Sequence, residues 1–274
     1  NQDMNRAAVE RLTLSGELRV ALAAGQLRAH YQPKVNLADG RLLGAEALVR
    51  WEHPGRGLLL PGAFIPVAES SHLIVEIGDW MLSEVCRQLV AWRQAGYPPV
   101  PVAVNLAAKH FRSPDLAQQI AGLLATHELP AQWLALELTE STLLDSGAAT
   151  METLTSLQTL GFSLAIDDFG TGYSSLSYLR DLPIDALKID RRFVQDLESR
   201  ADDRAFVSTI IALGQALGLA VIAEGVETDG QGAILREQGC DQAQGFFFAR
   251  PLCPERFAHD WLVDSGMTEA GDLG

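Results

Sequence analysis

The amino-acid sequence predicts an α/β protein built as a closed (β/α)8-type barrel. The first observation is a regular alternation of strand-like and helix-like segments after residue 99, which is the pattern of parallel βα units. The second is length, because 274 residues provide about the 250 that such a barrel needs. A doubly wound open sheet is the alternative. No Gly-x-Gly-x-x-Gly follows an early strand, which weakens a dinucleotide-binding version of that sheet.

The N-terminal part is expected to form a helix and then a hairpin. Residues 1–27 have helical spacing with Ser15 as the expected N-cap, and residues 1–14 are interpreted as a linker or tail from an upstream domain. Turn-forming residues at 36–40 join two strand-like runs, so an antiparallel hairpin is expected. The expected strands are Leu27–Val35 and Leu42–Trp51, and the helices after them are Pro61–Ala68 and Ile74–Ala95.

The rest of the chain is expected to alternate strands with helices and to complete a barrel domain over residues 15–264. Residues 265–274 lack periodicity and are expected to be a frayed tail. The expected strands are Val100–Leu106, Trp133–Thr139, Phe162–Asp167, Ala186–Asp190, Ala220–Glu224 and Asp241–Phe247. The expected helices are Asp115–His127, Gly147–Leu160, Leu176–Leu182, Asp202–Leu217, Gly230–Gln238 and Pro254–Val263.

Composition bounds the class of function. The net charge of −14 argues against binding long nucleic acid, which needs a basic surface. No apolar run reaches the roughly 18 residues of a membrane span. We expect a cytoplasmic location, or the cytoplasmic part of a membrane-anchored sensor protein. Cys86, Cys240 and Cys253 are widely spaced, so we expect free thiols buried as small hydrophobic residues.

The strands share a pattern of small and polar residues. Positions i and i+2 of a strand face the same way, and several strands carry a small residue two positions before a polar one. Bulky residues between them would face the helices, so the polar residues would point into the barrel. Chemistry in such barrels lies at the carboxyl ends of the strands. Seven polar residues are therefore expected to converge there: Glu46, Asn105, Glu137, Asp167, Lys188, Glu224 and Gln244.

The adjacent carboxylates Asp167 and Asp168 indicate a divalent-metal site. Two neighbouring anions lose hydration and repel each other unless a cation lies between them. The strand ends offer oxygen ligands without histidine or cysteine, which favours Mg²⁺ or Mn²⁺ over zinc. The pair could flank two ions about 3.5–4 Å apart, as in two-metal phosphoryl-transfer sites. Lys188 could orient or deprotonate a water activated there.

Nine short motifs follow one another along the chain. They are Tyr31-Gln-Pro-Lys34, Glu46-Ala-Leu48, Phe64-Ile-Pro-Val-Ala-Glu69, Val104-Asn-Leu106, Glu137-Leu-Thr-Glu140, Asp167-Asp-Phe-Gly-Thr-Gly-Tyr-Ser-Ser175, Leu187-Lys-Ile-Asp190, Ala223-Glu-Gly-Val-Glu227 and Gln244-Gly245. In order and spacing the chain resembles the EAL domain family, the cyclic di-GMP-specific phosphodiesterases, over roughly residues 15–262. The small departures from the family pattern are Ala107 and Phe246, where serine and tyrosine are frequent.

The resemblance implies a modified TIM barrel with one strand antiparallel to the others. It implies hydrolysis of cyclic di-GMP to linear pGpG by a water that two Mg²⁺ or Mn²⁺ ions activate. The matched metal ligands are Glu46, Asn105, Glu137, Asp167, Asp168 and Glu224, with Asp168 on the second ion. The matched catalytic set is Glu46, Asp168, Lys188, Glu224 and Gln244. Gln32, Leu48, Arg50 and Asn105 match substrate contacts, and Glu140 matches the residue that positions the loop after Asp168.

The resemblance also implies a homodimer, and fusion to upstream sensory or GGDEF-type domains. Because the family's glycine loop lies near a dimer interface, dimerisation is expected to change turnover by repositioning Asp168. One alternative is a catalytically weak cyclic di-GMP receptor, and another is an enolase-type proton abstraction by Lys188. The sequence leaves open whether Asp190 and Glu227 belong to the site or to helix starts.

Overall fold

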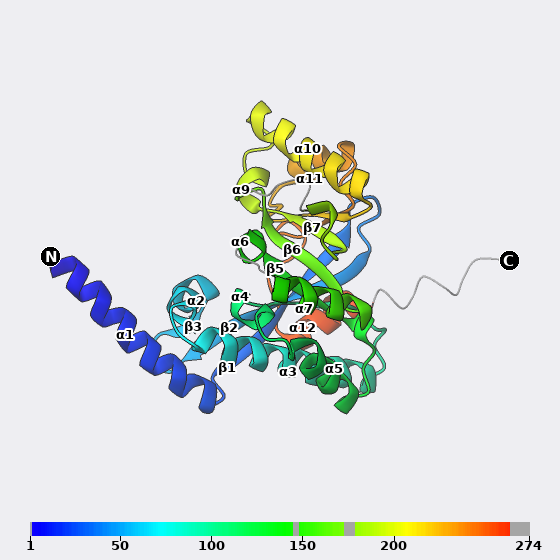
Figure 1. The fold of residues 1–274 in the computed structure, drawn as a ribbon. Coiled ribbons are helices and arrows are strands. Elements are labelled where there is room, and N and C mark those ends of the chain that lie inside the picture. Colours follow the sequence, from blue (N-terminus) through cyan, green and yellow to red (C-terminus); the bar gives the residue numbers. More distant parts are fainter. Residues whose placement is uncertain (1, 145–147, 173–178, 264–274) are drawn as a thin grey trace.

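The computed structural model describes residues 2–144, 148–172 and 179–263, and its strands close into a barrel surrounded by helices (Figure 1). The strands are β1 (Leu27–Asn36), β2 (Leu42–His53), β3 (Gly57–Leu59), β4 (Val102–Asn105), β5 (Leu134–Thr139), β6 (Ser163–Phe169), β7 (Ala186–Ile189), β8 (Ala220–Ala223) and β9 (Gln242–Ala243). The ring has the order β1-β9-β8-β7-β6-β5-β4-β2, and β3 extends the sheet beyond β2. Pairing of β1 with β2 closes the barrel, so the closed form is confirmed and the open sheet is wrong.

The hairpin accounts for the one antiparallel strand of the ring. Strand β1 runs antiparallel to β2, with Gln32 opposite Glu46, and antiparallel to β9, with Val35 opposite Ala243. The other neighbours in the ring are parallel. The parallel strands therefore bring their carboxyl ends to one mouth, and the hairpin places Glu46 beside them.

Helices cover the outside of the ring. They are α1 (Gln2–Ala23), α2 (Pro61–Glu69), α3 (Leu73–Gln94), α4 (Ala108–Phe111), α5 (Leu116–Thr126), α6 (Glu140–Leu144), α7 (Ala148–Thr159), α9 (Arg191–Val194), α10 (Ala201–Leu217), α11 (Asp229–Glu237) and α12 (Pro254–Phe257), with a π turn at Ala258–Leu262 and a 3₁₀ turn at Ala131–Trp133. Local sequence sets several ends. Helix α11 starts with a capping box between Thr228 and Gln231, and α10 stops where Gly218 adopts a left-handed φ of 71°.

The two faces of the barrel wall differ as the residue pattern predicted. Bulky side chains such as Val104 and Leu136 are fully buried in the large core between the strands and the helices. Ala165, Ala186 and Ile222 form a separate small cluster. These three share the strand face of the polar residues that follow them, so two alanines and an isoleucine lie in the barrel interior beneath the polar layer.

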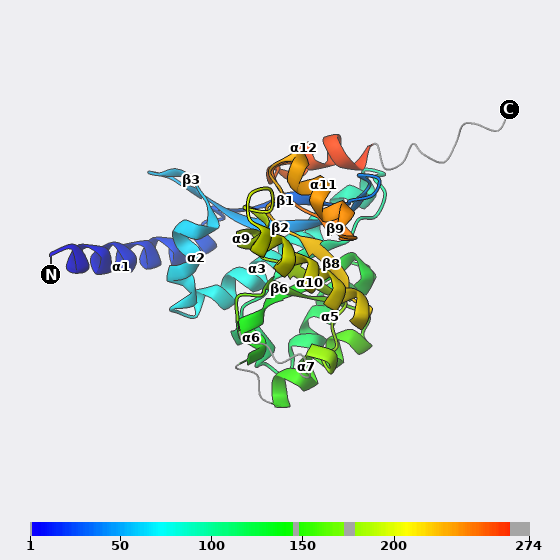
Figure 2. The same ribbon diagram turned by 90° about the horizontal axis from the view of Figure 1, so that it is seen from above.

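Several boundaries differ from the expectations. Ser15 lies inside α1 rather than at its start, and α1 extends away from the barrel (Figures 1 and 2). Strand β9 has two residues instead of seven, because Gly245 packs against the backbone of Val226, where even a Cβ would lie 2.1 Å from Val226 O. Strand β3 and the short helices α4, α6 and α9 were not anticipated. Ser174, Ser175, residues 176–178 of the helix predicted at 176–182 and the tail at 265–274 lie outside the described residues.

The cysteine expectation holds in part. All three thiols are free, and Cys86 and Cys240 are buried as predicted. Cys253 is exposed, so the prediction that it is a buried hydrophobic residue is wrong. It occupies the position before α12, where the chain passes over the surface.

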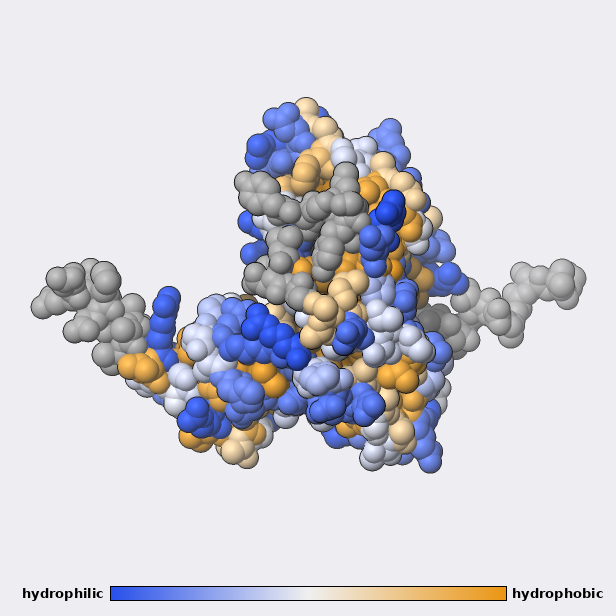
Figure 3. Space-filling model, in the orientation of Figure 1, coloured by the Kyte–Doolittle hydropathy of each residue, from blue (hydrophilic) through white to orange (hydrophobic). Residues whose placement is uncertain are grey.

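Exposed apolar side chains are scattered over the described surface. Figure 3 shows hydrophilic and hydrophobic residues interspersed on the viewed face. The large exposed ones include Leu12 on α1, Leu58 on β3 and Phe206 on α10. Within the three described ranges, the search for a helix long and apolar enough to cross a bilayer finds none.

Candidate active site

The seven strand-end residues meet in one network, as predicted. Glu46 accepts hydrogen bonds from Asn105 Nδ2 and from Gln244 Nε2, both at 2.6 Å. Lys188 links Glu46 to the remaining three members, which are Glu137, Asp167 and Glu224. The convergence is therefore a property of the fold, while the catalytic roles of these residues stay predictions.

Lys188 lies at the centre of the network and is fully buried. Its Nζ is 2.5 Å from Glu137 Oε2, 2.7 Å from Glu224 Oε1, 3.1 Å from Asp167 Oδ1 and 3.4 Å from Glu46 Oε2. Burial by itself lowers the pKa of Lys188, but the four carboxylates hold that pKa well above its usual value. Lys188 is therefore a charged hydrogen-bond donor in this arrangement, and it has no free lone pair with which to accept a proton.

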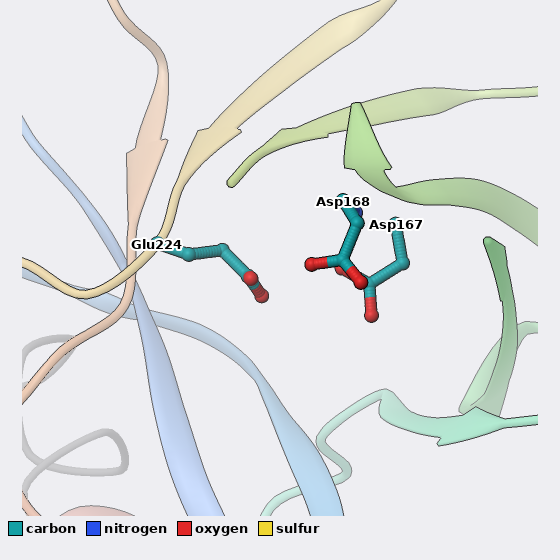
Figure 4. A group of neighbouring side chains, drawn as sticks. All are labelled: Asp167, Asp168 and Glu224. Atoms are coloured by element: carbon teal, nitrogen blue, oxygen red, sulfur yellow. The ribbon is translucent and has the colours of Figure 1, made fainter. Parts of the chain in front are cut away.

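Asp167, Asp168 and Glu224 form what we call the open edge of the site. The aspartates lie at the end of β6, and Glu224 reaches towards them from the end of β8 (Figure 4). One carboxylate oxygen from each residue lies within 4.8 Å of the others. Asp168 has a left-handed φ of 54°, which is costly for a residue with a side chain and frequent at functional sites. Its N–H donates to Asp167 Oδ1 at 3.0 Å.

The open edge is short of positive charge. Burial is the largest cause that raises the pKa of Asp167, Asp168 and Glu224 above ordinary carboxyl values. Neighbouring carboxylates raise these pKa values further, and for Asp168 the neighbour is Asp190. The charge of Lys188 lowers the three pKa values but only partly offsets these increases. A raised carboxyl pKa means that the ionised form is poorly compensated in the folded protein.

Glu137, Lys34 and Lys188 form what we call the base of the site. Glu137 is fully buried, with Oε1 3.0 Å from Lys34 Nζ and Oε2 2.5 Å from Lys188 Nζ. Burial raises the pKa of Glu137, but Lys188 and Lys34 outweigh burial and lower it below the ordinary glutamate value. Sequence reasoning missed Lys34. The signal was present, because Gln32 and Lys34 are alternate residues of one buried strand and so share a face.

Gln244 adds an unused acceptor to the network. Its Nε2 donates to Gln32 Oε1 at 2.9 Å as well as to Glu46, and Gln32 Nε2 donates to Ala249 O at 2.9 Å. Gln244 Oε1 is buried and has no hydrogen-bond partner among the residues that the structure describes. A buried carbonyl oxygen without a partner is suited to a water molecule or to the hydration shell of a cation.

Two pockets open onto the network, with volumes of about 610 and 290 Å³. Both are lined by Glu46, Leu48 and Asp167. The larger is walled by apolar residues of α2 and α3 such as Ile65, and the smaller includes Arg50.

Arg50 is suited to an anion in the smaller pocket. It is only 6% exposed, and its Nη1 donates to Val49 O at 2.9 Å. Within the described ranges it makes no salt bridge. Burial lowers the pKa of Arg50, although the guanidinium stays charged at neutral pH. The charge of Glu46 only partly offsets the effect of burial on Arg50, so this guanidinium is a favourable partner for a phosphate oxygen.

Glu140 holds the loop that follows the aspartates. It is buried, and its Oε2 accepts hydrogen bonds from the N–H groups of Gly170 and Gly172, both at 3.0 Å. This geometry agrees with the loop-positioning role expected for Glu140, which itself stays a prediction.

The structure places the two residues that the sequence left open. Asp190 caps α9 by accepting from Arg192 N at 2.7 Å, and after burial its charge is the next cause that raises the pKa of Asp168. Asp190 therefore combines a capping role with a position beside the open edge. Glu227 lines the smaller pocket, while its N–H donates to Gln231 Oε1 at the start of α11.

The open edge has the donor set of a divalent-cation site. Three carboxylates converge within 4.8 Å, they lack full compensation, and Gln244 Oε1 beside them has no partner in the described part of the chain. Hard cations such as Mg²⁺ prefer oxygen ligands of this kind. The residues present therefore fit a bound divalent cation.

Comparison with known proteins identifies the family. The sequence pattern of the EAL domain matches residues 15–251. The chain belongs to the EAL domain family. MucR of Pseudomonas aeruginosa, a bifunctional diguanylate cyclase/cyclic di-GMP phosphodiesterase, is 47% identical over 92% of this chain. NbdA of the same organism, a cyclic di-GMP phosphodiesterase, is 46% identical over 89% of it. The chain spans only 37% of MucR and 31% of NbdA.

Solved structures of EAL domains share the barrel. The MucR phosphodiesterase in complex with c-di-GMP superposes with a TM-score of 0.85 at 46% identity, covering 89% of this chain and 99% of that one. The EAL domain of Mycobacterium smegmatis DcpA gives a TM-score of 0.76 at 35% identity, covering 87% and 98%. The modified TIM barrel expected from the resemblance is therefore confirmed.

Proposed function

We propose that this EAL domain hydrolyses cyclic di-GMP at one phosphodiester bond and releases linear pGpG. The observation that carries the proposal is the single network of seven strand-end residues around Lys188, with its complete set of carboxylates. The names of MucR and NbdA state this phosphodiesterase activity for those proteins. The MucR phosphodiesterase that holds c-di-GMP is matched over almost its whole chain.

We propose Mg²⁺ or Mn²⁺ as the cofactor, with two ions per site. The ligands would be Glu46, Asn105, Glu137 and Asp167, with Asp168 on the second ion and Glu224 supporting an ion or its water. Ions bound there would neutralise charge on the phosphate and lower the pKa of a water between them.

The chain's own residues then position the substrate and the water. Arg50 donates to a phosphate oxygen in the smaller pocket, while Gln32 and Leu48 contact the nucleotide beside it. Gln244 Oε1 accepts a hydrogen bond from the attacking water and fixes its direction. Lys188, at the centre of the same carboxylates, orients the attacking water, which is the role that the resemblance implies for it.

We also propose that the chain is one part of a longer protein. The chain spans only 37% of MucR and 31% of NbdA, which supports fusion to upstream sensory or GGDEF-type domains. The net charge of −14 supports a small nucleotide rather than long nucleic acid as the substrate.

We further propose that the chain forms a homodimer whose interface adjoins the loop after Asp168. Light scattering at several protein concentrations tests this oligomeric state.

Product analysis tests the activity. The 274-residue chain is incubated with cyclic di-GMP and Mg²⁺, Mn²⁺ or a chelator. The nucleotides are then separated by chromatography and identified by mass spectrometry. We expect pGpG with either ion, none with chelator, and none from Glu46→Gln. Absence of turnover with both ions would reject the proposal. Tight binding without product would instead support the receptor alternative.

A further inference from the structure

A second buried ammonium group lies at the base of the site, and the proposed reaction does not use it. The lysines of the chain are Lys34, Lys109 and Lys188, and two of the three contact the same carboxylate. Lys34 Nζ is 3.0 Å from Glu137 Oε1, with the lysine side chain 9% exposed and the glutamate side chain 0% exposed. A buried cation is costly unless it is paired, so this pairing needs a physical account.

Lys34 reaches Glu137 from inside the barrel. It lies opposite Gly44 across the β1–β2 hairpin, and a Cβ at residue 44 would be 3.9 Å from Lys34 Cε. The lysine stem therefore runs alongside residue 44 at ordinary van der Waals distance, and the close neighbour of an added Cβ would be Pro101 O at 2.9 Å. Neither of the two pockets is lined by Lys34 or by Glu137. Lys34 lines neither pocket, so it acts on the site through the carboxylates near it: Glu137, which it contacts, and Glu46, which feels its charge.

The two lysines are not equivalent. Lys188 contacts four carboxylates, so it can give up Glu137 and keep three partners. Lys34 has one carboxylate partner in the described ranges, which is Glu137. When a cation draws Lys188 away from Oε2, Lys34 therefore stays on Oε1. The fold keeps one oxygen of this glutamate occupied and leaves the other exchangeable.

We infer that Lys34 is a positioning residue that restricts Glu137 to one available oxygen, Oε2, and that its charge keeps the affinity of the site for divalent cations low. The inference rests on the proposed metal site but not on the identity of the substrate. A fixed positive charge and a cation that share one carboxylate oppose each other, and this opposition is reciprocal. Removing the charge therefore strengthens cation binding and removes a counter-ion from the metal-free protein.

The test measures Mn²⁺ binding without nucleotide. The 274-residue chain and its Lys34→Met, Lys34→Gln and Lys34→Arg variants are titrated with Mn²⁺ by electron paramagnetic resonance, and their melting is followed in chelator and in Mn²⁺. We expect Lys34→Met to lower the Mn²⁺ dissociation constant by roughly tenfold or more. Its melting temperature should fall in chelator and recover in Mn²⁺. Lys34→Arg should resemble the parent, and Lys34→Gln, which keeps a donor without the charge, should be intermediate.

Two controls separate this role from a general loss of charge. Arg28→Met removes a surface cation that pairs with Glu52 at 2.7 Å, and it should leave Mn²⁺ binding unchanged. In a Glu137→Gln background, Lys34→Met should no longer tighten Mn²⁺ binding. This pair of variants also provides the comparison if Lys34→Met alone fails to fold in chelator.

Three outcomes would overturn the inference. The first is unchanged or weaker Mn²⁺ binding by folded Lys34→Met, and the second is equally tightened Mn²⁺ binding by Arg28→Met. The third is tightened Mn²⁺ binding on Lys34→Met substitution in the Glu137→Gln background. Absence of cyclic di-GMP turnover by the parent chain would overturn the proposed function and leave the Mn²⁺ result standing.

Discussion

The open edge and the base of the site use the same residue types in opposite electrostatic states. At the open edge, Lys188 pairs with Asp167 and Glu224, and the pKa values of these two residues and of Asp168 are raised, chiefly by burial. At the base, Glu137 has a separate lysine on each oxygen, and its pKa is lowered in spite of burial. The protein therefore compensates the negative charge of the carboxylate at the base, and it compensates the carboxylates of the open edge only in part.

This difference shows how one barrel interior can be stable and still bind a cation. The paired base holds the strand ends together without any added ion. The uncompensated edge gains from a divalent cation, because its carboxylates are costly to ionise without one. Lys188 contacts carboxylates of both regions, so its substitution should change the stability of the protein most.

Lys188→Met is expected to have the largest effect on stability. It leaves four carboxylates, two of them buried, without their shared counter-ion, and breaking a buried ion pair costs about 3–5 kcal/mol of unfolding free energy. Urea denaturation in chelator measures this loss. Arg28→Met, which breaks an exposed pair, should cost less than about 1 kcal/mol. Equal stability of Lys188→Met and the parent would contradict the account of the base.

Asp168→Asn is expected to affect activity strongly without lowering stability in chelator. The pKa of Asp168 is raised in the folded state, so its ionised form opposes folding at neutral pH, and a neutral amide removes that penalty. Turnover should fall on the order of 100-fold, because a proposed ligand of the second ion is lost. Parallel measurements of pGpG formation and of melting in chelator check both parts. A melting temperature several degrees lower would show that the open edge is structural.

Gly170→Ala tests whether backbone geometry holds the open edge. Gly170 has a φ of 98°, and an added Cβ would lie 2.9 Å from the Phe206 ring and 3.1 Å from the Phe193 ring. We expect a loss of about 1–3 kcal/mol in unfolding free energy, together with slower turnover as Asp168 shifts. Gly122→Ala is the matched control, because it lies within α5 with nothing within 4 Å, and it should stabilise the protein by roughly 0.5–1 kcal/mol. Full activity of Gly170→Ala would show that the backbone conformation at Gly170 does not position Asp168 for catalysis.

Thiol labelling gives the smallest and most local test. Burial raises the pKa of Cys86 to about 11 and that of Cys240 to about 12, so both are neutral thiols at pH values near 8. Cys253 is exposed, and iodoacetamide should modify it alone in the native protein, as peptide mass spectrometry would show. Cys240 precedes β9, between the strands that carry Glu224 and Gln244, so its labelling reports opening of that part of the barrel. Rapid native labelling of Cys240 would show that this part opens readily.

Local sequence was sufficient to predict most of the strands and helices and the polar residues that converge at the carboxyl ends of the strands. The alternation of strands and helices predicted the barrel, and the small-then-polar pattern predicted which residues converge. Local signals were insufficient where packing decides. Ser15 had the chemistry of a cap, yet α1 continues through it, and the strand expected after Asp241 ends at Ala243 because Gly245 packs on Val226.

The sequence by itself determined which side chains face the barrel interior, because strand periodicity fixes that choice residue by residue. It also predicted a cation site at Asp167 and Asp168, because two adjacent carboxylates at a strand end repel each other unless positive charge lies nearby. Only the tertiary structure decided how positive charge is divided among the carboxylates. Lys34 and Glu137 are 103 residues apart, and closure of the barrel by β1 brings them within 3.0 Å. Long-range pairing of that kind depends on the whole ring of strands, so no local pattern encodes it.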